Sequence, residues 1–484
     1  MIYVLPKWNS TVPIIPEFDN SVKQIQLFTE ASSDKVSVLS LSFASQTKRE
    51  LEDNDLENTP VFSMFNTLQR ALYVDEQRID INDFNWPKGL KIIEGDPLYY
   101  VYKNQVELYA KVWLHKKDYS FLNVIDFYEN NRRTHRYEFD DRGFLSRKIF
   151  YTDDQITPTE ELYFAPDQQI VMNHKIVDGR SSEITLENEF NGKNKFISLV
   201  DLQTEYLLNL SSDLENINNE LIVEYSKDNH EIIKKSNLQK ISKYLSFNNF
   251  NNLIQQINSD EIAEWKNIYN KIIVPNPKQK TELINLYPDL KEHVIDISPY
   301  PMHIKMYDLS LDAQEDKKNI LWVSQSDEDK NAIIEQFNKM LASDQEISLT
   351  ILPINEFPQE NMNLFDIQHR TKVKIDFNQS ESNIVKLIAS SRIVVDMAKY
   401  PNQFIQSKTL EAGLPQIVLT ITEYNREEGS YIQSTNENLA ENILGVTSDV
   451  KKWVQMRQRA MFSVKGFLSV EVMNRWNQVF NQEI

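Results

Sequence analysis

The sequence predicts an α/β protein made of two Rossmann-like domains, with an antiparallel β-sheet domain inserted into the first. Three observations support this prediction. Strand-like and helix-like runs alternate at the start of the chain and again through its second half. Between them lies a series of short runs of alternating polarity, separated by turn residues. The length of 484 residues suits two or three domains.

The first Rossmann-like domain is predicted at residues 1–95 and 200–306. Before the insert, the expected elements are a strand at Tyr3–Leu5, a helix on Phe18, Val22, Ile25 and Phe28, a strand at Val36–Phe43 and a helix at Pro60–Tyr73. After it, they are helices at Leu202–Leu214 and Ile232–Leu245 and extended runs at Leu221–Tyr225, Lys271–Val274 and Val294–Ile297.

The inserted domain is predicted at residues 96–199. Its runs include VELYAKVWL (Val106–Leu114), GFLSRKIFY (Gly143–Tyr151) and QIVMNHKIV (Gln169–Val177). Turn signals such as Asp178-Gly179 and Asn191-Gly192 separate successive runs. No fixed period recurs, so an antiparallel meander is expected rather than a repeat array.

The second Rossmann-like domain is predicted at residues 307–450, after a polar linker at Asp308–Lys318. Its expected strands are Asn319–Val323, Ile347–Ile351, Lys372–Asp376, Arg392–Asp396 and Gln416–Leu419, and its expected helices include Asp329–Leu341 and Glu381–Ala389. Residues 451–484 read as a basic, aromatic-rich helix that crosses back to the N-terminal domain. An alternative is that Trp453, Phe462, Phe467 and Trp476, with the nearby lysines and arginines, meet anionic lipid or an acidic partner.

Composition excludes several classes of function. The net charge of −19 disfavours nucleic-acid binding. There is no cysteine, and the seven histidines have no ligand-like spacing, so neither a metal nor another cofactor is expected. The first of only nine glycines is Gly89, so the first 88 residues hold no glycine-rich phosphate loop. Neither a signal peptide nor a membrane span is evident, which favours a cytoplasmic protein.

The stretch YPNQFIQSKTLEAGLPQIV, from Tyr400 to Val418, lies between two strand-like runs. This order resembles the donor-sugar corner of GT-B glycosyltransferases, which carry two glutamates with seven residues between them. In the resemblance, Gln403 stands for the first glutamate, Glu411 matches the second, and Gly413 matches the turn that follows.

An earlier stretch, ILWVSQSDEDK (Ile320–Lys330), resembles the part of these enzymes that neutralises the departing diphosphate. Ser324 stands for a glycine, Gln325 for an arginine, and Lys330 matches a lysine. An amide at position 325 cannot offset the charge of a diphosphate. The resemblance therefore implies a kept framework at Ser324, Gln325, Lys330, Gln403, Glu411 and Gly413, with two of its four charges lost.

Simpler structural roles stay open for these residues. Glu411 would then do no more than precede a Gly413 helix cap, and Lys330 would be a solvated helix residue. Gly413-Leu414-Pro415 is turn chemistry whatever the function. Other carboxylates, including Asp140-Asp141, are expected to be solvated surface in so acidic a chain.

Three further stretches carry a family resemblance: MIYVLPKWNS at the start, FNWPKG (Phe84–Gly89) and RYEFDDRGFLSR (Arg136–Arg147). They resemble the Asp-one family of accessory secretory proteins. The resemblance implies a GT-B-like, non-catalytic protein in the cytoplasm of Gram-positive bacteria. It also implies work with two companion accessory secretory proteins, the accessory SecA motor and serine-rich-repeat adhesin substrates. Peripheral contact with the inner face of the cell membrane stays open.

Three hypotheses for the function follow. The first is a glycosyltransferase-like component without turnover that assists adhesin modification and export. The second is an active retaining glycosyltransferase that uses a UDP-sugar on a Ser/Thr-rich polypeptide, which Glu411 and Lys330 keep open. The third is a module that binds glycans already present on the adhesin.

Overall fold

The computed structural model describes residues 1–8, 15, 18–32, 34–77, 79–95, 98–104, 106–114, 121–215, 219–247, 259–302, 318–354, 356–425 and 427–481. The chain forms two compact units, the first of Met1–Pro16 and Asp34–Ser246 and the second of Glu17–Ser33 and Phe247–Ile484. Except for Lys318, the predicted linker Asp308–Lys318 lies outside the described residues.

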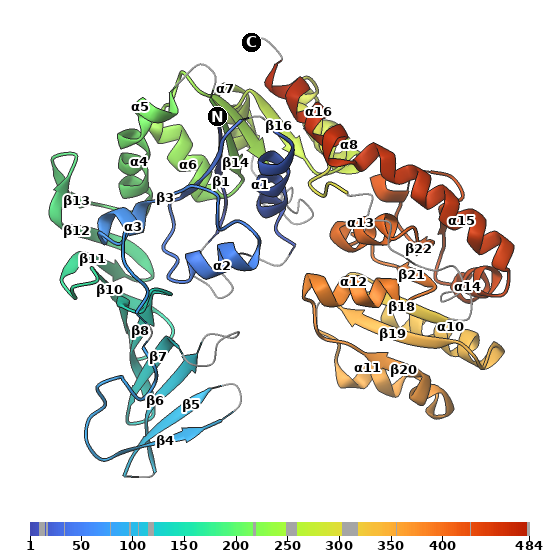
Figure 1. Ribbon diagram of the computed structural model, residues 1–484, viewed down its shortest axis with the longest axis horizontal. Coiled ribbons are helices and arrows are strands. Elements are labelled where there is room, and N and C mark those ends of the chain that lie inside the picture. Colours follow the sequence, from blue (N-terminus) through green and yellow to red (C-terminus); the bar gives the residue numbers. More distant parts are fainter. Residues whose placement is uncertain are drawn as a thin grey trace. The chain divides into compact units, whose positions relative to one another are not determined.

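The first unit contains a parallel sheet with strand order β15-β14-β1-β2-β3, and Figure 1 labels its strands β1, β3 and β14. Its strands are β1 (Ile2–Leu5), β2 (Val36–Ser40), β3 (Val61–Ser63), β14 (Glu220–Glu224) and β15 (Ser242–Ser246). The helices of this unit are α2 (Thr47–Asp53), α3 (Met64–Leu68), α4 (Leu199–Asn209), α5 (Ser211–Leu214) and α6 (Lys227–Ser236).

The insert is a single ten-stranded antiparallel sheet in which every strand pairs with its neighbours in sequence. Its strands are β4 (Leu90–Glu94), β5 (Tyr99–Lys103), β6 (Glu107–Leu114), β7 (Leu122–Glu129), β8 (Arg132–Phe139), β9 (Leu145–Tyr151), β10 (Pro158–Phe164), β11 (Ile170–Val177), β12 (Arg180–Phe190) and β13 (Lys193–Phe196). The predicted meander is confirmed, and it begins one strand earlier than expected, at β4.

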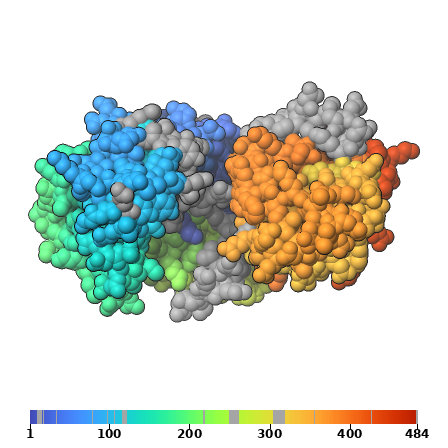
Figure 2. Space-filling model, turned by 90° about the horizontal axis from the view of Figure 1, so that it is seen from below, coloured from blue at the N-terminus to red at the C-terminus, as the bar shows by residue number. Residues whose placement is uncertain are grey.

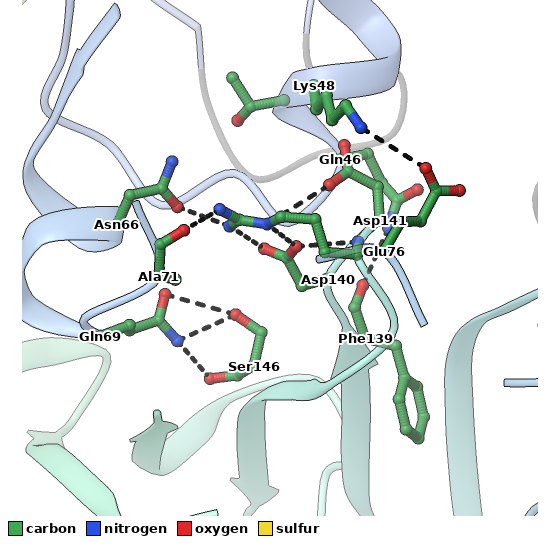
Figure 3. A network of polar contacts seen from close by, with 12 residues as sticks. Gln46, Lys48, Asn66, Gln69, Ala71, Glu76, Phe139, Asp140, Asp141 and Ser146 are labelled. Carbon is green, nitrogen blue, oxygen red and sulfur yellow. Dashed lines mark hydrogen bonds and ion pairs between the residues drawn. The ribbon is translucent and has the colours of Figure 1, made fainter. Parts of the chain in front are cut away.

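A docking cluster of Asn66, Asp140, Asp141 and Arg142 fastens the β8–β9 hairpin to α2 and α3 (Figure 3). The Arg142 guanidinium binds both oxygens of Asp140, at 2.6 and 2.8 Å, and donates to Asn66 Oδ1 at 2.8 Å and to the Ala71 carbonyl. Asp141 Oδ2 accepts from the Arg49 backbone N–H at 2.9 Å.

Both carboxylates of the docking cluster are buried, so the expectation that Asp140 and Asp141 are solvated surface is wrong. Local sequence could not reveal this burial, because α2 and α3 come from a distant part of the chain. Burial and the neighbouring Asp140 charge raise the pKa of Asp141 above its usual range. The RYEFDDRGFLSR motif therefore has a structural role within the first unit.

The second unit contains a six-stranded parallel sheet of order β20-β19-β18-β21-β22-β23. These strands are β18 (Asn319–Ser324), β19 (Ser348–Pro353), β20 (Val373–Ile375), β21 (Ile393–Asp396), β22 (Gln416–Val418) and β23 (Tyr431–Gln433). The same unit contains the parallel pair β16 (Lys271–Val274) and β17 (Val294–Asp296).

Helices pack against both faces of the six-stranded sheet, as expected for parallel strands. Figure 2 shows the outer surface of this part of the chain in yellow to orange. Trp322 of β18 lies in the core of one face, and the adjacent Val323 lies in the core of the other. The helices of this unit are α1 (Asn20–Ala31), α7 (Ser259–Ile268), α8 (Pro277–Leu286), α10 (Lys330–Ser343), α11 (Gln359–Asn363), α12 (Glu381–Ala389), α13 (Gln403–Glu411), α14 (Leu439–Thr447), α15 (Val450–Ser463) and α16 (Ser469–Phe480). Short 3-10 turns are η1 (Pro288–Leu290), η2 (Ile367–Lys372), η3 (Glu423–Asn425) and η4 (Val464–Phe467).

The predicted C-terminal helix is two helices, α15 and α16, separated by η4 and the extended residue Leu468. Trp453, Phe467 and Trp476 are buried, so of the four aromatic residues only Phe462 is placed to face a lipid surface. Trp476 packs edge-on against Phe28 of α1 at 5.2 Å between ring centroids. Among the described residues, no helix is both long and apolar enough to cross a membrane.

Two predicted helices are partly strands in the structure, and local capping explains both. Residues 61–63 form β3, because Ser63 is the N-cap of α3 and its side chain accepts from the Asn66 N–H. The helix predicted at Ile232–Leu245 ends at Ser236, because Asn237 adopts the left-handed conformation (φ 46°), and β15 follows.

Candidate functional site

The turn between β18 and α10 contains three of the predicted site positions and folds around a carboxylate of its own. Ser324 Oγ donates to Glu328 Oε1 at 2.7 Å, and the Gln325 backbone N–H donates to the same oxygen at 3.0 Å. Trp322 Nε1 donates to Glu328 Oε2 at 3.2 Å. Both oxygens of Glu328 are therefore bound by groups of the turn and of the strand that leads into it.

Gln325 faces a second carboxyl group, that of Asp396. Gln325 Nε2 donates to Asp396 Oδ1 at 3.2 Å, and the Ala398 backbone N–H donates to the same oxygen at 3.2 Å. Asp396 ends β21, which pairs with β18, so the two carboxyl ends of these strands lie side by side. Asp396 is 2% exposed, and its Oδ2 has no hydrogen-bond partner among the described residues.

Lys330 begins α10, and its ammonium is directed back to the turn. Its Nζ donates to the Gln325 carbonyl at 2.8 Å, while Asp329 caps the helix through the Ala332 N–H at 3.1 Å. The lysine therefore holds the turn backbone in addition to starting the helix.

Carboxyl groups surround this turn, and they offer no positive charge to a polyanion. Burial raises the pKa of Glu328 to about 7, although hydrogen bonds from Ser324 and Trp322 lower it. Burial also raises the pKa of Asp396 to about 8; the Ala398 N–H lowers it and the Glu328 charge raises it. Asp327 lies in the same turn and accepts from the Tyr400 N–H at 2.7 Å. A diphosphate placed here would meet three carboxyl groups and no arginine at position 325.

Gln403, the first residue of α13, lines a hollow in the second unit. Amides, hydroxyl groups and ammonium groups surround it, among them those of Asn276, Lys278, Gln279, Tyr400, Thr420 and Thr422. Lys278 and Lys399 each lie 5.4 Å from the centre of the Tyr400 ring. The lining is polar and also includes the Glu282 carboxyl group.

Glu411, the last residue of α13, is held in a chain of alternating charges. Its Oε2 accepts from Lys408 Nζ at 2.9 Å, and the side chain is 2% exposed. Lys408 also lies 3.8 Å from Glu381, which pairs with Lys23 of α1 at 2.9 Å. This carboxylate is therefore already neutralised by a lysine of its own helix.

Gly413 ends α13 in the left-handed conformation, with φ 65°. The Leu414 N–H donates to the Thr409 carbonyl at 3.1 Å, and Arg457 Nε donates to the Gly413 carbonyl at 3.3 Å. A Cβ at position 413 would lie 2.7 Å from the Met461 side chain. Helix termination and close packing both require glycine here.

The six candidates thus fall into two groups. Ser324, Gln325 and Lys330 share the β18–α10 turn, whereas Gln403, Glu411 and Gly413 all belong to α13 and its end. The turn is tied to the loop that precedes α13 through Asp327 and the Tyr400 N–H, and neither of these two residues was among the candidates.

Sequence reasoning missed three ionisable residues. Glu328 and Asp396 place carboxyl groups at the β18–α10 turn, and Lys408 neutralises Glu411. Asp396 could have been found, because it ends a strand-like run and the carboxyl ends of neighbouring parallel strands meet at one edge of a sheet. Glu328 carried no signal, because a carboxylate that folds back on its own turn has no distinctive spacing.

These features define a class of protein, the GT-B glycosyltransferase-like fold, and the predicted fold class is confirmed. The structure is similar to the pneumococcal O-GlcNAc transferase GtfA in complex with UDP and GlcNAc (TM-score 0.73, 10% identity, 99% of this chain and 98% of that chain).

It is also similar to chains of two solved complexes. One is the Glycosylation Associate Protein (Gap123) complex of Streptococcus agalactiae (TM-score 0.79, 20% identity, 99% of this chain and 100% of that chain). The other is accessory secretory protein 1, 2 and 3 of Streptococcus pneumoniae (TM-score 0.79, 18% identity, 100% of this chain and 99% of that chain).

The family model for the accessory Sec system protein Asp-one matches residues 6–366 and 355–483. The chain therefore belongs to the Asp-one family of accessory Sec system proteins, which confirms the resemblance found in the sequence. A relative of that description in Staphylococcus aureus is 21% identical over 538 residues, covering 100% of this chain and 99% of the relative.

Proposed function

We propose that the chain is a non-catalytic, glycosyltransferase-like component of the accessory Sec system. In this role it assists the modification and export of glycosylated serine-rich-repeat adhesins in the cytoplasm. One observation carries the proposal: where a diphosphate would need an arginine, the β18–α10 turn presents Gln325 between the carboxyl groups of Glu328 and Asp396. The ion pair between Glu411 and Lys408 supports it further.

Companion accessory secretory proteins are the partners we infer for it. The two similar complexes, whose descriptions name Gap123 and accessory secretory proteins 1, 2 and 3, support such an assembly. The accessory SecA motor and the adhesin substrate are proposed from membership of the family, and so is a peripheral membrane contact.

A turnover assay tests the absence of catalysis. The purified chain would be incubated with UDP-GlcNAc and a Ser/Thr-rich polypeptide, while released UDP and added sugar mass are both measured. We expect neither above the level of a blank without protein. Sugar transfer that is lost on Glu411→Ala would contradict the proposal and support an active glycosyltransferase instead.

Glycan binding is a second candidate function, favoured by the hollow around Gln403. Its amides and hydroxyl groups can pair with sugar hydroxyls, and no cationic group is needed for a neutral sugar. Saturation-transfer NMR with a GlcNAc-bearing Ser-rich peptide tests it. Signal that is weakened by Gln403→Ala, but unchanged by Gln359→Ala on the exposed surface of α11, would support this function; equal signal from all three proteins would remove it.

A further inference from the structure

The turn between β18 and α10 has the donor arrangement of an anion site. Three groups of different chemistry converge on one carboxylate: an indole N–H from Trp322, a hydroxyl from Ser324 and the backbone N–H of Gln325. Their distances of 2.7 to 3.2 Å are those of ordinary protein hydrogen bonds. Indole N–H, hydroxyl and backbone N–H groups can each donate to an anionic oxygen.

These donors are distinct from the N-terminus of α10. That helix end is capped separately by Asp329, whose Oδ1 accepts from the Ala332 N–H. The set therefore does not depend on the helix dipole. It depends on the side chains of Trp322 and Ser324 and on the backbone N–H of Gln325. The two side chains are held rigidly by packing in the sheet core, because both residues are at most 1% exposed.

We propose that this turn is an anion site whose occupant is its own Glu328 carboxylate, and that an inorganic phosphate or pyrophosphate would bind there only when that carboxylate is removed. The inference concerns the same turn as the proposed function, but it does not require that function, because it predicts how the turn is filled rather than whether sugar is transferred.

Self-occupation has a structural consequence for the rest of the site. The turn is tied to the loop that precedes α13 through Asp327 and the Tyr400 N–H. Tyr400 also lines the hollow around Gln403, so this contact joins the turn to the wall of the hollow. The Asp396 carboxyl group, which accepts from Gln325 Nε2, supplies no positive charge for an external anion next to the turn.

Thermal unfolding of the full chain with and without added anion tests this inference. Glu328→Ala leaves the three donors without an acceptor, and we expect its midpoint to fall by about 5 °C. Inorganic pyrophosphate or phosphate at about 10 mM should restore at least half of that loss, because it returns an acceptor to the same donors. Wild type should shift by less than about 1 °C under the same conditions.

Glu328→Gln is the matched control, because its amide fills the same space and keeps one acceptor oxygen. Rescue by the anions should be absent for this variant, and sodium chloride at equal ionic strength should rescue neither variant. Equal stabilisation of wild type and Glu328→Ala, or no stabilisation of Glu328→Ala, would overturn the inference.

If Glu328→Ala is insoluble, Glu328→Ser takes its place with the same expected rescue and the same contradicting result. The two proposals fail separately. If anions do not rescue Glu328→Ala and wild type transfers no sugar, only the self-occupied site is contradicted. If wild type transfers sugar, only the proposed function is contradicted.

Discussion

Arg142→Ala should cost the first unit about 3–5 kcal/mol of unfolding free energy. The change leaves the carboxylates of Asp140 and Asp141 buried without their cation, and it removes the donor to the Ala71 carbonyl. The loss of stability should be greatest where the insert contacts α2 and α3, because the docking cluster joins the β8–β9 hairpin to those helices (Figure 3).

Urea unfolding, together with amide hydrogen exchange of the β8–β9 hairpin, measures this cost. The hairpin and α3 should exchange faster in the variant than in wild type. Arg132→Ala is the matched control, since Arg132 begins β8, the first strand of the same hairpin, but is exposed. An Arg142→Ala protein with the same urea midpoint and exchange as the control would show that the docking cluster is not needed for the insert to dock.

Asp396→Asn should remove much of the pH dependence of the stability of the second unit. In an unfolded chain an aspartate ionises near pH 4, whereas burial raises the pKa of Asp396 to about 8 in the fold. Between these values the folded unit holds a proton that the unfolded chain has released. The unfolding free energy therefore falls as pH rises, by up to about 1.4 kcal/mol per pH unit, or about 2 kcal/mol from pH 6 to pH 8.

The asparagine variant cannot ionise at this position, so its unfolding free energy should lose the pH dependence that Asp396 contributes. Only the pH dependence from Glu328 should remain, because the pKa of Glu328 is raised to about 7. Urea unfolding at pH 6 and pH 8 for both proteins measures the difference. Asp178→Asn, at an exposed hairpin turn, controls for the change of net charge. Parallel pH profiles for wild type and Asp396→Asn would contradict a buried, protonated Asp396.

The order of elements was predictable because it depends on local hydrophobic pattern. The insert was predictable from alternating runs and turn pairs such as Asp178-Gly179, and the second sheet from its short apolar runs. The errors in predicted helix bounds occurred where a single residue starts or ends a helix. Ser63 starts a helix and Asn237 ends one, and neither choice is visible in the apolar pattern of the surrounding residues.

The candidate site was predictable as a set of positions but not as a set of contacts. Gln325 could be located because it follows a strand, and Glu411 because it precedes a turn. Their partners, Asp396 and Lys408, depend on strand order and on rotamers in the fold. The burial of Asp140 was missed for the same reason, because the docking cluster also includes a contact to Ala71, which lies 71 residues before Arg142 in the chain.

Calorimetric titration of wild type with UDP and UDP-GlcNAc tests the central claim most directly, namely that the β18–α10 turn does not accept a diphosphate. The matched variant is Lys330→Ala, which removes the ammonium that is directed at the turn. We expect no binding heat from either nucleotide with either protein. Saturable binding to wild type that is weakened by Lys330→Ala would contradict the account and would establish the turn as a working diphosphate site.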